Sequence, residues 1–216
     1  MDTLLDPTYS EEFASTRPTP ICVHGVRGFV CSLDSVLTPH ECDSLIKNAE
    51  EKGFSSASLY TDKQGVEHYS DIRKSQRTII DSQAFVDELW KRIRHTVPQT
   101  WGGRTLHIPP TAKSPLNPRL RFLKYATPGD EFQLHCDGQY ASPDGGISQL
   151  TILLYLNIGY EGAFTHFVAD DDTTLVPILP TVGGIAIQDQ RLMHCVPPLI
   201  SGTKYVIRTE VMYKAQ

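Results

Sequence analysis

Eight short strand-like segments, separated by turns, dominate the second half of the chain. They are residues 119–125, 131–135, 149–157, 164–168, 174–176, 184–188, 192–195 and 204–213. Gly, Pro, Asp and Ser mark the turns between them, as at residues 127–130 and 143–146. Strands at this spacing predict a mainly β fold, a double-stranded β-helix barrel of the jelly-roll or cupin type.

Two helices are predicted upstream of these strands, at residues 38–52 and 82–96. The first has a complete start signal: Thr38 as N-cap, Pro39 at the first helical position and Glu41 three residues after the cap. In the second, Phe85, Leu89 and Ile93 form an apolar stripe. Both helices are expected to buttress one sheet. Basic residues then form a solvated face of the second helix: Lys91, Arg92, Arg94 and His95.

The remaining segments divide the chain into a tail and one domain. Residues 1–20 show no sustained periodicity and are predicted to be an N-terminal tail or an arm over the surface. Residues 21–216 then form a single domain, with a strand at residues 25–33. Residues 55–80 are polar and irregular, which is typical of either a mobile surface loop or a functional lid.

Composition limits the classes of partner. The net charge of −5 argues against nucleic-acid binding, and no apolar stretch is long enough to span a bilayer. The 5 cysteines form no CxxC pair, which favours reduced thiols in an intracellular protein. No signal-peptide pattern is present at the N-terminus. We therefore expect a cytoplasmic protein.

The segment around His135 and Asp137 contains the first candidate chemistry. Residues i and i+2 of a strand project from the same face, so an imidazole and a carboxylate can act together here. With a second histidine they would form the 2-His-1-carboxylate set that holds Fe(II) and leaves coordination positions open. If the strands close into a barrel, His194 is the natural third ligand.

A second feature lies on the last predicted strand, where Lys204, Val206 and Arg208 share one face. A cation deep in an apolar barrel requires a partner, because an unpaired buried charge is very unfavourable. A bound anion, such as a dicarboxylate whose other end reaches the metal, would meet that requirement.

Together these residues resemble the Fe(II)/2-oxoglutarate-dependent dioxygenases, and among them the prolyl-4-hydroxylase-like catalytic domain. That family has His-x-Asp, a distal His, and a Lys or Arg nine or ten residues later. It also has an aromatic residue ten before the first His, here Tyr125, and a Tyr-Leu-Asn strand end, here residues 155–157. Its Gly-Gly-x-Thr-x-Phe signature matches residues 162–167, with Ala163 in place of the second Gly.

The resemblance implies roles for these residues. His135, Asp137 and His194 would hold Fe(II), and 2-oxoglutarate would place its far carboxylate on Lys204 and Tyr155, with Tyr125 nearer the metal. Dioxygen is the other cosubstrate, and succinate and CO2 are the expected products. The retained Asp137 favours hydroxylation or a related oxidation, because related halogenases have a small residue at that position.

Several residues are candidates for contacting the substrate. Arg208 is either the true partner of the far carboxylate or a hook for an acidic substrate. Arg121 alternates with Tyr125 on one strand and is expected to line the pocket. Arg73 and Arg77 are expected to reach over the mouth, which Tyr140 also frames.

The preferred hypothesis is an oxygenase that oxidises an unactivated C–H bond of a small molecule, carboxylated or not, such as an amino acid or a biosynthetic intermediate. Two alternatives stay open: a peptidyl-prolyl hydroxylase acting on a protein, and a non-catalytic metal-binding barrel.

Overall fold

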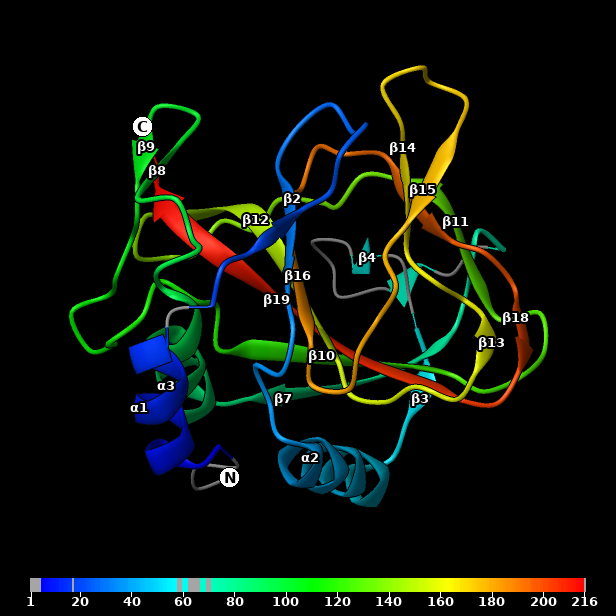
Figure 1. Cartoon of the computed structure of the whole chain (residues 1–216), viewed down its shortest axis with the longest axis horizontal. Coiled ribbons are helices and arrows are strands. Elements are labelled where there is room, and N and C mark those ends of the chain that lie inside the picture. The colour runs from blue at the N-terminus through cyan, green and yellow to red at the C-terminus, as the bar shows by residue number, and fades with distance from the viewer. Residues whose placement is uncertain (1–4, 17, 58–59, 62–66, 69–70, 216) are drawn as a thin grey trace.

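Two antiparallel sheets face each other in the computed structural model, with the helices on the outer side of the larger sheet (Figure 1). The structure describes residues 5–16, 18–57, 60–61, 67–68 and 71–215. The helices are α1 (Pro7–Thr16), α2 (Pro39–Lys52) and α3 (Gln83–Ile93). None of the described helices has the length and apolar character needed to cross a membrane.

The larger sheet has eight strands. In spatial order they are β1 (Ile21–Cys22), β2 (Val30–Leu33), β16 (Ile185–Asp189), β12 (Gly146–Tyr155), β19 (Lys204–Lys214), β10 (Arg119–Tyr125), β7 (Gln76–Asp81) and β3 (Ser55–Ser56).

The smaller sheet has five strands: β15 (Leu175–Pro177), β14 (His166–Val168), β17 (His194–Val196), β11 (Glu131–His135) and β6 (Arg73–Lys74). Three further two-stranded pairs are β13 (Glu161–Gly162) with β18 (Leu199–Ser201), β4 (Tyr60–Thr61) with β5 (Glu67–His68), and β8 (Thr100–Trp101) with β9 (Arg104–Thr105). The predicted double-stranded β-helix is confirmed. The eight predicted strands correspond to β10, β11, β12, β14, β15, β16, β17 and β19.

Side-chain alternation on the larger sheet builds two separate cores. On β10, Phe122 packs outward with the helices, whereas Leu123 packs inward toward the smaller sheet. On β19, Ile207 and Val206 divide in the same way. This follows from the two-residue period of a strand. The outer core fixes the sheet on the helices, and the inner face is left to form a cavity between the sheets.

The predicted capping box of α2 is present. Glu41 N donates to Thr38 Oγ1 (3.2 Å), and Thr38 N donates to Glu41 Oε2 (2.7 Å). Gly53 ends the helix with a positive φ of 84°. Glu41 therefore satisfies helix-end donors, and its carboxylate is buried.

The prediction that Arg92 lies on a solvated face is wrong. Arg92 is fully buried, and its guanidinium donates to Glu41 Oε1 (2.7 Å), Glu41 Oε2 (2.9 Å), Ser10 Oγ (2.9 Å) and the carbonyl of Val36 (2.7 Å). The burial of Arg92 could not be predicted, because it stands among the basic residues of 91–95 and helical periodicity does not identify which of them faces a buried acid.

α1 forms within the segment predicted to be a tail or an arm. Leu5 and Phe13 join the outer core, and Ser10 is buried against Arg92. The helix lies beside α3 (Figure 1). Its order is therefore explained by tertiary contacts and not by periodicity. The division of the chain at residue 20 stays a prediction.

Two segments differ from the expected pattern. Gln76–Asp81, predicted as part of an irregular segment, is strand β7, which pairs with β10. The expected strand at residues 25–33 is limited to Val30–Leu33, because Gly25 and Gly28 have positive φ and form a turn. The loop-or-lid prediction for residues 55–80 falls partly on residues outside the described ranges.

We predict that Arg92→Met destabilises the fold by about 3–5 kcal/mol, because it leaves the buried Glu41 carboxylate without its cation. The free energy of unfolding in urea measures the change. Arg94→Met, at an exposed position two residues later, is the control and should change it by about 0.5 kcal/mol or less. A loss below about 1 kcal/mol for Arg92→Met would contradict the assigned role.

Candidate metal centre and cavity

The pairing of β11 with β17 brings two histidines together. His135 and His194 are directly opposite in the antiparallel register, and their ring centroids are 4.2 Å apart. Asp137 follows β11 by two residues, and its backbone N–H donates to the carbonyl of Gln190 (3.0 Å). One ligand atom from each of the three residues lies within 4.8 Å of the others.

Both imidazoles are fixed by backbone carbonyls. His135 Nδ1 lies 2.7 Å from the carbonyl of Gln133, and His194 Nδ1 lies 2.9 Å from that of Leu192. A carbonyl oxygen only accepts, so each Nδ1 carries the proton and each Nε2 keeps its lone pair. Metal-binding histidines are commonly oriented in this way.

A stack of side chains supports His135. The Phe132 ring stacks on the imidazole at 3.5 Å between centroids, and the Arg73 guanidinium lies over the Phe132 ring, 4.9 Å from its centroid. Burial, together with the nearby His194, lowers the pKa of His135 to about 4. The imidazole is therefore neutral at neutral pH, as a metal ligand must be.

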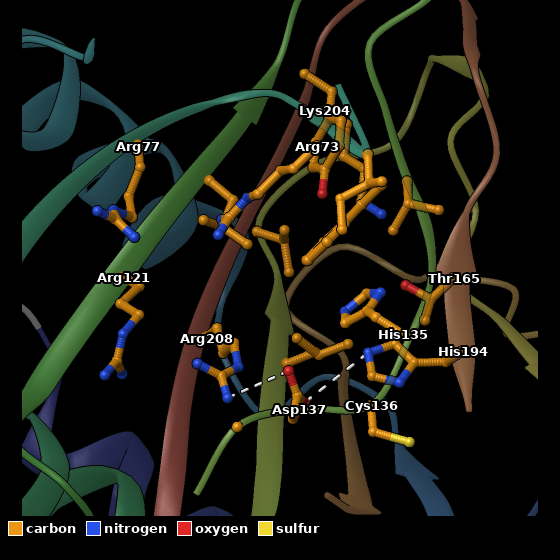
Figure 2. A pocket seen from close by; sticks show the side chains of 18 of the residues that line it. Arg73, Arg77, Arg121, His135, Cys136, Asp137, Thr165, His194, Lys204 and Arg208 are labelled. Atoms are coloured by element: carbon orange, nitrogen blue, oxygen red, sulfur yellow. Dashed lines mark ion pairs between the residues drawn. The ribbon is translucent and has the colours of Figure 1, made fainter. Parts of the chain in front are cut away.

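Asp137 is held on both oxygens. Thr151 Oγ1 donates to Oδ2 (2.7 Å), and Arg208 Nη2 lies 3.2 Å from Oδ1 (Figure 2). Gln188 Nε2 lies 3.5 Å from the same Oδ2. Burial acts to raise the pKa of Asp137, but Arg208, His194 and Thr151 outweigh it and lower the pKa to about 2. The carboxylate is ionised throughout the neutral range.

This donor set fits a divalent transition metal. It offers the Nε2 atoms of two imidazoles and one ionised carboxylate, all lining one cavity. His194 Nε2 also lies 3.4 Å from Gln188 Nε2. Two histidines and one carboxylate are the usual set for non-haem Fe(II) sites that keep positions open for other ligands.

A cavity of about 490 Å³ lies beside the three residues. All but one of the predicted site residues line it: Tyr125, His135, Asp137, Tyr140, His194, Lys204, Arg208, Arg121, Arg73 and Arg77. The exception is Tyr155, which lies behind the wall and donates from its hydroxyl to Thr165 Oγ1 (3.3 Å). Thr165 itself lines the cavity.

Lys204 is the unusual cation of this cavity. It is 1% exposed, it donates to the carbonyl of Ala163 (2.7 Å), and among the described residues it forms no ion pair. Its ammonium lies 5.3 Å from the Tyr125 ring centroid and 5.8 Å from that of Tyr155. Burial lowers the pKa of Lys204 to about 7.

Arg208 is in a different situation, because it contacts two carboxylates. Its Nη2 lies near Asp137, and its Nη1 is 3.0 Å from Glu210 Oε1. Burial acts to lower the pKa of Arg208, but Asp137 and Glu210 outweigh it and raise the pKa. Arg121 Nη1 is 2.8 Å from the same Glu210 oxygen.

Sequence reasoning missed the residues behind the ligands. Thr151 and Gln188 each touch Asp137; Thr151 stands between Leu150 and Ile152, and Gln188 directly follows the apolar run at residues 185–187. A hydroxyl or amide beside such apolar residues is the signal that could have identified them. Ala163 has a φ of 51°, which explains why the related signature has glycine there.

No family model and no curated protein sequence matches the chain. Solved structures do match. A viral collagen prolyl hydroxylase from Paramecium bursaria Chlorella virus-1, in complex with 2-oxoglutarate, has a TM-score of 0.56 and 20% identity, and the match covers 85% of this chain and 95% of that one.

Two other prolyl hydroxylases are also similar. A Pseudomonas putida prolyl-4-hydroxylase has a TM-score of 0.60 at 15% identity, covering 86% of this chain and 93% of that one. A Trichoplax adhaerens enzyme, solved with a hypoxia-inducible-factor peptide, has a TM-score of 0.61 at 18% identity, covering 96% and 90%. The chain therefore has the fold of prolyl-4-hydroxylase-like 2-oxoglutarate oxygenases.

We predict that Thr151→Val weakens binding of a divalent metal by about 10- to 100-fold, because Asp137 loses the hydrogen bond that orients it. Calorimetric titration with Mn(II) measures the dissociation constant. Thr111→Val, at an exposed loop position, is the matched control and should leave the constant unchanged. Equal affinities for Thr151→Val and the unaltered chain would show that Thr151 does not orient the ligand.

Proposed function

We propose that this protein is an Fe(II)- and 2-oxoglutarate-dependent oxygenase. The observation that carries the proposal is the group of His135, Asp137 and His194, in which both Nδ1 atoms face backbone carbonyls. It lies beside a cavity lined by Lys204, whose ammonium forms no ion pair among the described residues. The similar fold of enzymes solved with 2-oxoglutarate supports it. Together these features favour an enzyme over a non-catalytic metal-binding barrel.

Bound Fe(II) with 2-oxoglutarate and O2 supplies an oxidation strong enough for an unactivated C–H bond, and succinate and CO2 are released. The chain's own residues have simpler tasks. The two histidines and Asp137 hold the metal, and Thr151 holds Asp137. Leu123, Leu153 and Val206 exclude water from the space between them.

Lys204 is the better candidate than Arg208 for the far carboxylate of 2-oxoglutarate. Arg208 already contacts the carboxylates of Asp137 and Glu210, whereas Lys204, in the part of the chain that the structure describes, is buried with only a carbonyl and two aromatic rings. A buried cation gains most from an anion when none is present. Tyr155 would support this subsite through Thr165 and not by direct contact.

The substrate in this proposal is a small molecule, such as an amino acid or a biosynthetic intermediate. A cavity of about 490 Å³ is within the usual range for small-molecule sites. The alternative is a peptidyl-proline, since similar structures include prolyl hydroxylases and one was solved with a peptide.

Succinate formation tests the proposal. We expect protein supplied with Fe(II), 2-oxoglutarate and O2 to release succinate, with stimulation by one member of a metabolite panel. Asp137→Ala and His194→Ala should abolish release, because each removes a metal ligand. Circular dichroism checks that both variants fold. The proposed oxygenase activity would be refuted if no compound and no proline peptide gave succinate, and if no charge-transfer band formed in the absence of oxygen.

Lys204→Met should raise the KM for 2-oxoglutarate by about 10- to 100-fold, because a charge-assisted contact is lost at similar volume. Binding of the anion requires protonated Lys204, whose pKa is about 7 in the ligand-free cavity. The dissociation constant should therefore be flat below pH 7 and rise above it, by up to about tenfold per pH unit.

Calorimetry across this pH range measures the effect, and Lys204→Met should flatten the profile above pH 7. Arg208→Ala is the comparison. A larger rise in KM for Arg208→Ala than for Lys204→Met would assign the far carboxylate to Arg208 instead.

A further inference from the structure

The wall formed by β10 and β19 carries cations at both ends and apolar side chains between them. Three of its five cross-strand pairs line the cavity: Tyr125 with Lys204, Leu123 with Val206, and Arg121 with Arg208. All six residues line the cavity. The wall therefore has two positive ends and an apolar middle.

The two ends lie at separate positions along the wall. Lys204 and Arg208 are four residues apart on one strand, which separates their Cα atoms by about 13 Å. Under the proposed function, a five-carbon dicarboxylate held at Lys204 would extend toward the three metal-binding residues and not along the strand to Arg121. The arginine end is thus available to a second molecule.

Glu210 organises the arginine end into a fork. Its Oε1 accepts from Arg121 Nη1 (2.8 Å) and forms an ion pair with Arg208 Nη1 (3.0 Å), and its Oε2 accepts from Asn117 Nδ2 (2.8 Å). One buried carboxylate therefore fixes two guanidinium groups beside each other. Arg208 Nε is also buried and has no hydrogen-bond partner among the residues that the structure describes. This N–H group therefore still requires an acceptor at the arginine end of the wall.

The charges of the centre leave room for one more anion. Arg121 and Arg208 balance Glu210 and Asp137. A divalent metal and Lys204 then add three positive charges, of which 2-oxoglutarate neutralises two. Arg73 and Arg77 also line the cavity, but both have other interactions, so they are left out of this balance.

We infer that the Arg121–Arg208 fork binds a carboxylate of the substrate, which makes the substrate a small carboxylic acid. This inference rests on the proposed function. The planar guanidinium fork matches a carboxylate, and a neutral, amide-flanked prolyl residue offers it no charge. The fork thereby selects a free acid over a peptide at the same metal centre.

The test uses the complex with Fe(II) and 2-oxoglutarate without oxygen. Calorimetry compares small amino acids and dicarboxylic acids with their carboxamides, with phosphate monoesters and with a proline peptide blocked at both ends. We expect at least one acid to bind about 10- to 100-fold more tightly than its amide. Equal binding of every acid and amide, or preferred binding of a phosphate ester or the blocked peptide, would overturn the inference.

Arg121→Gln should weaken binding of the selected acid by about 10- to 100-fold. Arg119→Gln removes a charge at an exposed position on the same strand and should change it by about twofold or less. Should Arg121→Gln fail to fold because Glu210 loses a partner, Arg121→Gln combined with Glu210→Gln removes both charges. An unchanged affinity in whichever of these variants folds would overturn the inference.

Succinate release under oxygen separates the two conclusions. Acid binding that depends on Arg121 without any succinate would preserve the carboxylate subsite and refute the oxygenase. Succinate release driven equally by an acid and its amide would preserve the oxygenase and refute the subsite.

Discussion

The register between paired antiparallel strands is the constraint on which the site depends. His135 faces His194 because β11 pairs with β17 in one register, and Arg121 faces Arg208 because β10 pairs with β19 in another. A slip of one residue in either pair would turn these side chains to the opposite face of the sheet. Between β10 and β19 the outer core prevents that slip, because Phe122 and Ile207 would then leave the helices and enter the cavity.

Two buried cations, Arg92 and Lys204, and the partly buried Arg208 show how differently this fold meets the unfavourable burial of charge. Arg92 is neutralised by the bidentate contact with Glu41, which joins α2 to α3. Arg208 is held between two carboxylates. Lys204 has a carbonyl and two aromatic rings but, among described residues, no anion. The first two arrangements are complete within the chain, and the third is not, so a ligand anion is the natural partner of Lys204.

Much of the fold was predictable because it depends on local signals. Strand alternation and turn residues located β10 and β11 at their observed bounds, and the capping box located the start of α2. α1 was not predictable in this way, since its order comes from Phe13 and Leu5 packing in the outer core. β7 was missed because Arg77 and Thr78 make the strand look polar: Arg77 lines the cavity, and Thr78 is buried opposite Phe122 of the outer core.

The site was predictable to the extent that its residues are close in sequence or follow strand alternation. His135, Asp137 and Lys204 satisfy that condition, and alternation from Tyr125 located Arg121. Contacts between distant strands were not predictable. Glu210 forms ion pairs with both Arg121 and Arg208, and Thr151 donates a hydrogen bond to Asp137. These contacts can be identified only once the pairing of the strands is known.

The apolar middle of the β10–β19 wall sets where the proposed chemistry could occur. Leu123 and Val206 lie between the two cationic ends, and Leu153 of β12 joins them in the cavity lining. Charged groups of a ligand are stabilised at Lys204 or at the arginines and are disfavoured between them. Hydrocarbon is the part of a ligand that fits beside these side chains. Under the proposed function, holding acids at the two ends therefore leaves C–H bonds in the middle of the cavity, next to the three metal-binding residues.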